Sequence, residues 1–284
     1  MTTGAARLGR SGARALPLGP RRFGRVNWIG TAALYRRETW RLQKDYLDSL
    51  LGPALANLIF MLILTVAAGG GAVGGGSGTT VAGLPLTDFI APGLIMFAAG
   101  ERAFSAACVS ILFDKLEGMI GDVVMAPLTS GERLAAFAGA SMSAGAISGA
   151  ATAAVLWPFA HILPAHPAAF FYFLIAGSLL LGFLGTVAGL WARRWDHYAA
   201  LLAYFLVPFS YLSGMFYSTL GLPELARQLI ALNPLYYVID GMRYGMTGYA
   251  ETAIGPGALL ILVLDLALAG LVYGLLRSGW RLKA

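Results

Sequence analysis

The chain contains several apolar blocks, each long enough for a helix that crosses the roughly 30 Å hydrocarbon core of a bilayer. Only 12% of its 284 residues are charged, whereas a soluble domain carries about 25%. Charge this sparse cannot cover a water-facing surface. We therefore expect an all-α polytopic membrane protein with six transmembrane helices, at residues 50–68, 89–113, 134–157, 168–191, 199–216 and 258–276.

The Lys and Arg residues are distributed unevenly, and their distribution predicts the orientation. Ten of the 20 lie in the first 44 positions, and the expected external loops 69–88 and 158–167 contain none. Because cytoplasmic loops carry the excess of basic residues in membrane proteins, we expect both termini in the cytoplasm. A basic segment beside the first span also explains the net charge of +6 by attraction to anionic lipid. We expect no nucleic-acid partner.

Residues with catalytic or metal-binding chemistry are sparse. Cys108 is the single cysteine and lies inside an apolar block, which excludes an intrachain disulfide or a zinc cluster. His161, His166 and His197 have no carboxylate or cysteine partners at metal-ligand spacing. The Gly-rich stretch 69–78 lacks the Lys-Ser or Lys-Thr of a phosphate loop, so we interpret it as a flexible linker. We expect no enzyme activity, no metal and no cofactor in this chain.

The N-terminal residues differ in composition from the rest of the chain. Residues 1–25 are rich in Arg, Gly, Ala and Pro and contain no acidic residue. This composition predicts a disordered basic cytoplasmic tail that precedes a single transmembrane domain at 26–284. No apolar segment follows Arg21-Arg22 directly, which excludes a twin-arginine signal, while an organelle transit peptide stays open as an alternative.

Residues 26–49 are expected to form an amphipathic interface helix along the cytoplasmic membrane surface. We expect a break at Gly52-Pro53, since proline interrupts helical hydrogen bonding. The alternative is the soluble end of a longer first helix. One face repeats at three- and four-residue steps and another face is charged: Trp28, Ala32, Tyr35, Thr39, Leu42, Tyr46 and Leu50 against Arg37, Arg41, Lys44 and Asp48.

Two glycine patterns and one interrupted segment refine the expected packing. Gly145-x-x-x-Gly149 and Gly185-x-x-x-Gly189 permit close helix approach, which we expect inside one subunit. The segment 217–257 is too apolar for an ordinary loop, but prolines and glycines interrupt it. Non-helical backbone survives at membrane depth only where protein buries it. We therefore expect two short re-entrant helices there, between the fifth and sixth spans.

Three ionisable residues lie inside the predicted spans. Glu101 and Arg102 lie near the middle of the second span, and Asp265 lies in the sixth. A charge at such a position costs at least about 2.5 kcal/mol, so each needs a partner or a wet cavity. Glu101 and Arg102 are adjacent and point about 100° apart on a helix, so they are poorly placed to pair. Asp265 is a candidate partner for Arg102, and Glu101 a candidate to line a transport path; a buried structural network is the alternative.

The cytoplasmic connection 114–130, between the second and third spans, predicts a short amphipathic helix. Acidic residues lie beside its apolar positions, and Pro127 follows its end. Such a helix can dock in the groove of a partner. The alternative is a solvated loop helix without a partner. The apolar face comprises Leu116, Ile120, Val123 and Val124.

Four motifs in fixed order resemble the type-2 ABC exporter permeases of the NodJ and YadH kind. The resemblance runs from about Arg25 to the C-terminus. The motifs are Phe89-Ile-Ala-Pro-Gly-Leu, then Lys115-Leu-Glu-Gly with Ala126-Pro-Leu-Thr, then Tyr211-Leu-Ser-Gly-Met-Phe-Tyr, and finally Asn233-Pro-Leu-Tyr-Tyr followed by Gly241-Met-Arg-Tyr-Gly.

The resemblance implies that two permease copies pair with two ATPase subunits, and that the segment 114–130 couples them. It also implies that the segment after the fifth span closes the extracytoplasmic exit. ATP and Mg²⁺ then bind the ATPase subunit, while this chain contacts the bilayer, a second permease copy and the transported substrate. The candidate ATPase-coupling residues are Asp114, Lys115, Glu117, Gly118, Asp122 and Pro127.

The expected function is export of a bulky substrate, such as a polysaccharide, lipooligosaccharide or lipid, across the inner (plasma) membrane. Exporters of drugs or other small amphipathic molecules share the architecture, and an ion-coupled secondary carrier is the rival from another class. Tyrosines near the outer face either stack on sugar rings or form an interfacial aromatic belt. The candidate residues of the translocation path are Glu101, Arg102, Tyr211, Asn233, Tyr237, Arg243 and Asp265.

Overall fold

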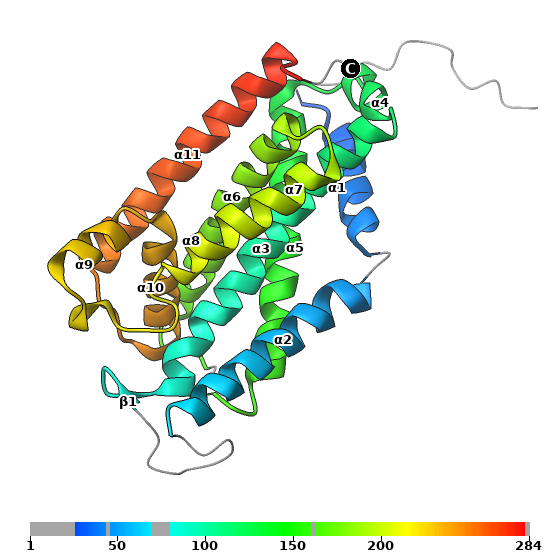
Figure 1. The fold of residues 1–284 in the computed structure, drawn as a ribbon. Helices are drawn as coiled ribbons and strands as arrows, with labels where there is room; N and C mark the ends of the chain where they lie inside the picture. The colour runs from blue at the N-terminus through cyan, green and yellow to red at the C-terminus, as the bar shows by residue number, and fades with distance from the viewer. Residues whose placement is uncertain (1–25, 44–45, 70–79, 161–162, 282–284) are drawn as a thin grey trace, which may run out of the picture.

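The computed structural model describes residues 26–43, 46–69, 80–160 and 163–281, and within them the chain is helical apart from one short hairpin (Figure 1). The expected tail 1–25 and nearly all of the Gly-rich stretch lie outside the described residues. The long helices are α2 (Tyr46–Ala67), α3 (Leu86–Leu116), α5 (Ser130–Leu156), α6 (Pro167–Trp191) and α11 (Ile254–Ser278).

Shorter elements connect and flank these helices. They are α1 (Trp28–Gln43), β1 (Thr80–Val81), β2 (Leu84–Pro85), α4 (Ile120–Met125), α7 (Trp195–Leu201), a π-helical segment η1 (Leu202–Leu206), α8 (Val207–Tyr211), a 3₁₀ turn η2 (Thr219–Gly221), α9 (Glu224–Ala231) and α10 (Pro234–Thr247).

Five of the described helices are long and apolar enough to cross a membrane: α2, α3, α5, α6 and α11. They match five of the six predicted spans, which confirms a multi-pass, all-helical membrane protein. The structure extends α3 and α11 at both ends, and α2 and α5 at their N-terminal ends, by two to four residues. The residues added to α2, α3 and α5 include polar side chains, which a hydropathy pattern leaves out.

The prediction of one regular helix at 199–216 is wrong in its details. The helical run begins at Trp195, changes to π geometry in η1 and ends at Tyr211, where a turn with Gly214 at φ +70° follows. Pro208 lies in this run and has no backbone N–H, so a regular hydrogen-bond ladder cannot pass through it.

The expected break at Gly52-Pro53 is also wrong. The chain leaves α1 at Gln43 and has already begun α2 at Tyr46, and α2 continues through Pro53. Pro53 lies in the early turns of α2 and removes one intrahelical hydrogen bond there. Membrane helices tolerate such a loss where neighbouring groups satisfy the freed carbonyl.

The hairpin β1–β2 follows the first span and was not predicted. Thr80 pairs with Pro85 and Val81 with Leu84 in antiparallel register. Ala82 and Gly83 both have positive φ, at 53° and 83°, as a two-residue type I′ turn requires. Without Asn-Gly or Asp-Gly at these positions, the sequence carries only a weak signal for the turn.

The centre of the bundle is formed by α3, α5 and α6, with α10 packed against α3 and α6. Glycines bring these helices together: a Cβ on Gly185 of α6 would lie 2.3 Å from the carbonyl oxygen of Phe104 of α3. A Cβ on Gly145 of α5 would lie 2.8 Å from the carbonyl oxygen of Ala99. Close approach at these glycines inside one subunit is thereby confirmed.

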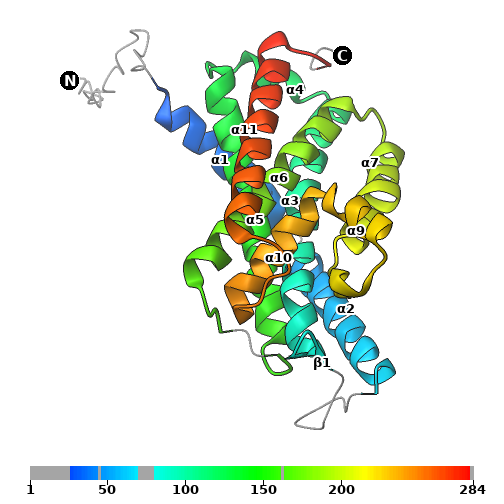
Figure 2. The same cartoon turned by 90° about the vertical axis from the view of Figure 1, so that its left-hand side faces the viewer.

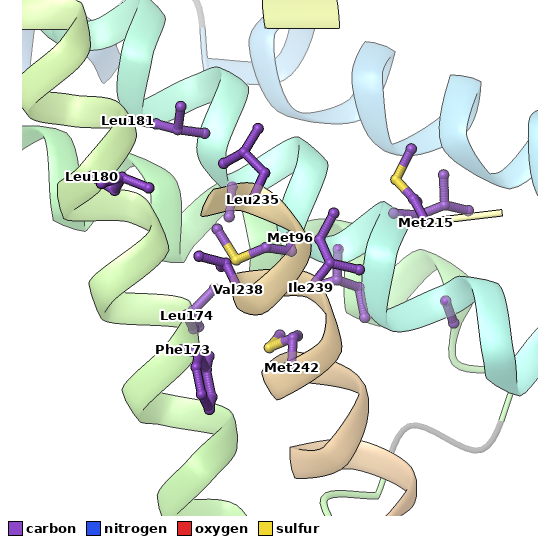
Figure 3. Close-up of a cluster of buried hydrophobic side chains, with 14 of the residues drawn as sticks. Met96, Phe173, Leu174, Leu180, Leu181, Met215, Leu235, Val238, Ile239 and Met242 are labelled. Atoms are coloured by element: carbon purple, nitrogen blue, oxygen red, sulfur yellow. The ribbon is translucent and has the colours of Figure 1, made fainter. Parts of the chain in front are cut away.

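The largest apolar cluster joins α3, α6 and α10. Figure 3 shows Met96, Phe173, Val238 and Met242 converging between the three helices. A Cβ on Gly177 would meet both Val238 and Met96, at 2.5 and 2.7 Å, so α6 lacks a side chain where the other two helices approach it. The short helix α10 is therefore part of the core.

The two ends of the bundle are distinct. Figures 1 and 2 both place α4 at the same end as the C-terminal end of α11, and β1 at the opposite end. We call these the α4 end and the hairpin end. The predicted docking connection 114–130 lies at the α4 end, and the helix α2 runs from the α1 side toward the hairpin end.

We predict that Gly185→Ala lowers the stability of the bundle, because the new Cβ would overlap the Phe104 carbonyl and push α3 from α6. Overpacking of this kind costs about 1–3 kcal/mol. The midpoint of thermal unfolding in detergent measures the effect. Gly270→Ala in α11 is the matched control, since a Cβ there meets nothing within 4 Å. Equal midpoints for the two variants would contradict the packing described here.

Candidate functional site: a docking surface and a transport path

The connection between α3 and α5 is a compact, well-defined unit. It turns at Gly118, whose φ of +73° suits glycine. The helix α4 follows, and a capping box then begins α5: the Thr129 hydroxyl accepts from the Glu132 amide, while the Glu132 carboxylate accepts from the Thr129 amide. The segment therefore holds a fixed shape at the α4 end.

The predicted apolar face of this segment divides between two environments. Ile120 and Val123 are buried and pack in a cluster with Phe137 of α5. Leu116 and Val124 of the predicted face are 44% and 38% exposed, and Met125, which the prediction did not include, is 85% exposed. Glu117, Gly118, Asp122 and Pro127 are exposed around them. We call Leu116, Glu117, Asp122, Val124 and Met125 the docking ridge.

Asp114 lies apart from the docking ridge. It is only 1% exposed, and its Oδ1 accepts hydrogen bonds from Arg37 Nη2 at 2.6 Å and Arg41 Nη2 at 2.8 Å. Glu38 is also buried, and the Ser110 hydroxyl donates to it. Burial raises the pKa of Glu38 above its ordinary value, although the Ser110 hydrogen bond and the Arg37 charge oppose this.

The charged face of α1 contacts the bundle. Arg37 and Arg41 point to α3, whereas Trp28 and Trp40 are exposed. The physical reason is the buried Asp114 carboxylate, which needs cationic partners. The exposed aromatic residues suit the headgroup region of a bilayer.

Two further polar residues at the α4 end bind within the chain. Lys115 Nζ donates to the carbonyl oxygens of Leu190 at 2.8 Å and Gly189 at 3.2 Å, so it caps the C-terminal end of α6. Glu132 Oε1 accepts from the backbone amide of Asn27 at 2.5 Å. Sequence analysis missed Glu132, although the Thr129-x-x-Glu132 spacing is the signal of a capping box.

The ionisable residues of α3 face the start of the fifth helical run. Glu101 and Arg102 are partly exposed in the single chain. Tyr198 of α7 donates to the Ser105 hydroxyl at 3.0 Å, and Ser105 lies one turn from Glu101 on the same side of α3. Asp265 lies on α11, which packs against α5, α6 and α10, and its Oδ1 is buried without a hydrogen-bond partner.

The run from α7 to α8 presents an aromatic surface and an interrupted backbone. Val207 N–H donates to the Leu202 carbonyl, a π-type bond, and Pro208 supplies no donor. A carbonyl of the preceding turn is therefore left without an intrahelical amide, and inside a membrane it needs another polar partner. Tyr204 is 83% exposed, and Phe205 and Phe209 are exposed beside it.

Tyr211 belongs to an aromatic cluster that joins three helices. Its ring centroid lies 6.1 Å from that of Phe97 of α3 and 5.4 Å from that of Phe216. Phe216 in turn lies 4.9 Å from Phe60 of α2. Tyr211 is also partly exposed. The cluster places it where α2, α3 and α8 meet.

The other path candidates near the hairpin end bind within the chain. Asn233 is buried and caps α10: its Oδ1 accepts from the Leu235 amide at 3.0 Å, and its Nδ2 donates to the Phe209 carbonyl at 2.7 Å. Tyr237 donates to the Ala231 carbonyl at 3.1 Å. In the single chain these contacts orient α9 and α10.

Arg243 is the largest fully buried side chain of the described residues, at 1% exposed. Its guanidinium donates to the Gly214 carbonyl at 2.8 Å and the Phe89 carbonyl at 3.3 Å, and it lies 3.9 Å from the Phe89 ring centroid. It also pairs with Asp240 at 3.4 Å. Arg243 thus joins α10 to the start of α3 and to the turn after α8.

Asp240 completes this network and was not predicted. It is fully buried and accepts from the amides of Glu251 and Thr252 and from the Thr252 hydroxyl at 2.6 Å. Glu251 accepts from the Thr219 amide at 2.9 Å. The Asp240-x-x-Arg243 spacing on one helix face was the available signal. The network fixes α10, its connection to α11 and η2 as one unit.

An apolar groove of about 540 Å³ lies between α8 and α9. Asn233 lies at its polar edge, and leucines of α9 are exposed beside it. The groove can accept an acyl chain, the apolar part of a substrate or a neighbouring subunit. Its lining residues are Phe209, Leu212, Tyr217, Leu222, Ala226, Leu229, Ile230, Leu232 and Asn233.

Comparison with known proteins identifies the family of the chain. A family model for ABC-2 type transporters matches residues 30–247. The inner membrane transport permease YadH of Escherichia coli strain K12 is 24% identical over 261 residues, which cover 90% of this chain and 98% of YadH. YadH of Shigella flexneri matches to the same extent. The chain therefore belongs to the ABC-2 type transporter family and is a membrane-embedded transport subunit, distinct from the ATPase.

Proposed function

We propose that this chain is the permease subunit of an ATP-driven exporter in the inner membrane, in which two permease copies pair with two ATPase subunits. The docking ridge is the observation that carries the proposal. It exposes apolar side chains beside carboxylates in a structured connection between two spans. A transport subunit of this family needs a partner that hydrolyses ATP with Mg²⁺, and an exposed apolar ridge of this kind suits such a contact.

The proposed topology has six spans, with the run from α7 to α8 as the fifth and both termini in the cytoplasm. The absence of Lys and Arg from 69–88 and 158–167 supports an external hairpin end. The α4 end is then cytoplasmic. The helices α9 and α10 are the re-entrant pair near the exit, since they follow the fifth run and α10 packs inside the bundle.

The proposed path runs along the aromatic surface of η1 and α8, with Glu101 near its cytoplasmic side. Exposed Tyr and Phe rings can stack on sugar rings, and the groove at α9 can hold a lipid chain. This combination favours a polysaccharide, lipooligosaccharide or lipid. Export of small amphipathic drugs uses the same surfaces. An ion-coupled carrier would instead depend on Glu101, Arg102 and Asp265, and it would show no dependence on ATP.

We predict that Met125→Glu weakens ATPase binding by tenfold or more, since an unpaired charge would be buried in an apolar contact. A tenfold loss corresponds to about 1.4 kcal/mol. Binding of the purified ATPase to the permease in nanodiscs measures it. Leu163→Glu is the matched control, because Leu163 is 71% exposed at the hairpin end. Equal binding by both variants would refute docking at the ridge.

We predict that Tyr204→Leu reduces substrate stimulation of ATP hydrolysis several-fold while leaving basal hydrolysis unchanged, because the ring contacts substrate and not the ATPase. The complex is reconstituted in vesicles with either a lipid-linked oligosaccharide or a small amphipathic dye. We expect the oligosaccharide to stimulate hydrolysis. Phe171→Leu in α6 is the control, since Phe171 is also exposed but lies outside the proposed path. If the Tyr204→Leu complex responds like the control, Tyr204 faces lipid and does not contact the substrate.

A further inference from the structure

The helix α1 contacts both ends of the predicted coupling segment 114–130. Arg37 and Arg41, in the C-terminal half of α1, bind Asp114, where the segment begins. Asn27, which directly precedes α1, binds Pro127 and Glu132, where the segment meets α5. The segment is therefore attached to α1 at both of its ends. An interface helix that only rests on the membrane would need neither attachment.

The first attachment is the buried carboxylate of Asp114. Arg37 and Arg41 both donate to the same oxygen, at 2.6 and 2.8 Å, and Arg41 Nη1 also reaches the Ser110 carbonyl at 3.4 Å. The Arg41 guanidinium further lies 5.0 Å from the Phe113 ring centroid. A carboxylate that is 1% exposed cannot leave both guanidinium groups without becoming an unpaired buried charge. The end of α3 and the C-terminal half of α1 therefore move together.

The second attachment is at the start of α1. The Asn27 amide donates to Glu132 Oε1 at 2.5 Å, and Asn27 Nδ2 donates to the Pro127 carbonyl at 3.2 Å. Asn27 Oδ1 also accepts from the Gly30 amide at 2.9 Å, so the same residue caps α1. A Cβ on Gly30 would lie 2.8 Å from Leu128, which shows how closely α1 approaches the segment.

The helix α1 leads directly to the first span. Only residues 44 and 45 separate Gln43 from Tyr46, which limits the separation of these two Cα atoms to about 11 Å. Within its apolar stretch α2 is 28% buried, whereas α3 and α6 are each 78% buried. The first span thus buries a smaller share of its residues than the central helices do, and it follows α1 directly in the chain.

We propose that Asp114 and Glu132 are positioning residues that lock α1 to the coupling segment, so that ATP-driven displacement of the segment is transmitted through α1 to α2. This inference rests on the proposed function, and it deepens that function by naming the route by which the ATPase acts. Asp114 then acts inside the permease, and the contact with the ATPase falls to the docking ridge.

The test uses the complete permease–ATPase complex in vesicles and the variant Asp114→Asn/Glu132→Gln. Spin labels on cysteines introduced at Val66 of α2 and Phe171 of α6, in a Cys108→Ala background, report the distance between these helices. Both positions are exposed. The distance is measured without nucleotide and after trapping with ATP and vanadate. Wild type is expected to show a shift between the two states. The variant is expected to lose at least half of that shift while it keeps ATPase binding and hydrolysis within twofold.

Two controls make the outcome decisive. Asp196→Asn removes an exposed carboxylate at the start of α7 and is expected to keep the full shift. If Asp114→Asn does not fold, Arg41→Met with Glu132→Gln replaces it, because Asp114 then keeps Arg37. A full shift in the folded double variant would overturn the proposal and leave the proposed function intact. A wild-type permease that does not bind the ATPase would overturn both this proposal and the proposed function.

Discussion

A bilayer supplies no hydrogen-bond partners, and this constraint decides where every polar group of the chain can lie. The middle of the bundle is therefore built from glycines and apolar side chains, which let α3, α5 and α6 approach until backbone atoms touch. Two clusters of paired polar side chains lie near the two ends, whereas Asp265 lies within a span and its buried Oδ1 has no hydrogen-bond partner. Asp114 lies in one cluster and Arg243 in the other, and each is 1% exposed.

The two clusters of polar side chains have different consequences. Around Asp240 and Arg243, the bonds join α10 to its flanking connections and to the start of α3, which makes the region at the proposed exit one unit. Around Asp114, the bonds join α1 to the C-terminal end of α3. The cluster around Arg243 thus fixes the position of α10, and the cluster around Asp114 is the proposed route of transmission from the coupling segment to α1. The single chain thus combines a closely packed core with a first span that buries a smaller share of its residues.

The sequence predicts the spans well because helix length and apolar composition are local properties. Five predicted spans match helices, whereas the capping box of Thr129 and Glu132 was not predicted although its spacing is also a local property. The partner of Glu132 could not be predicted, since Asn27 lies 105 residues away. For α1, periodicity distinguishes two faces but does not say which one the bundle covers. The π segment before Pro208 depends on helical hydrogen bonding that composition does not encode.

The proposed function requires the α4 end to bind an ATPase through the docking ridge. A photo-crosslinking residue placed at Met125 tests it directly, with a second placed at Leu163 at the hairpin end. Both side chains are strongly exposed in the single chain. We expect the Met125 site to cross-link to the ATPase in membranes, and the Leu163 site to give no such product. Cross-linking from Leu163, or none from Met125 in a complex that hydrolyses ATP, would show that the ATPase does not bind at the docking ridge.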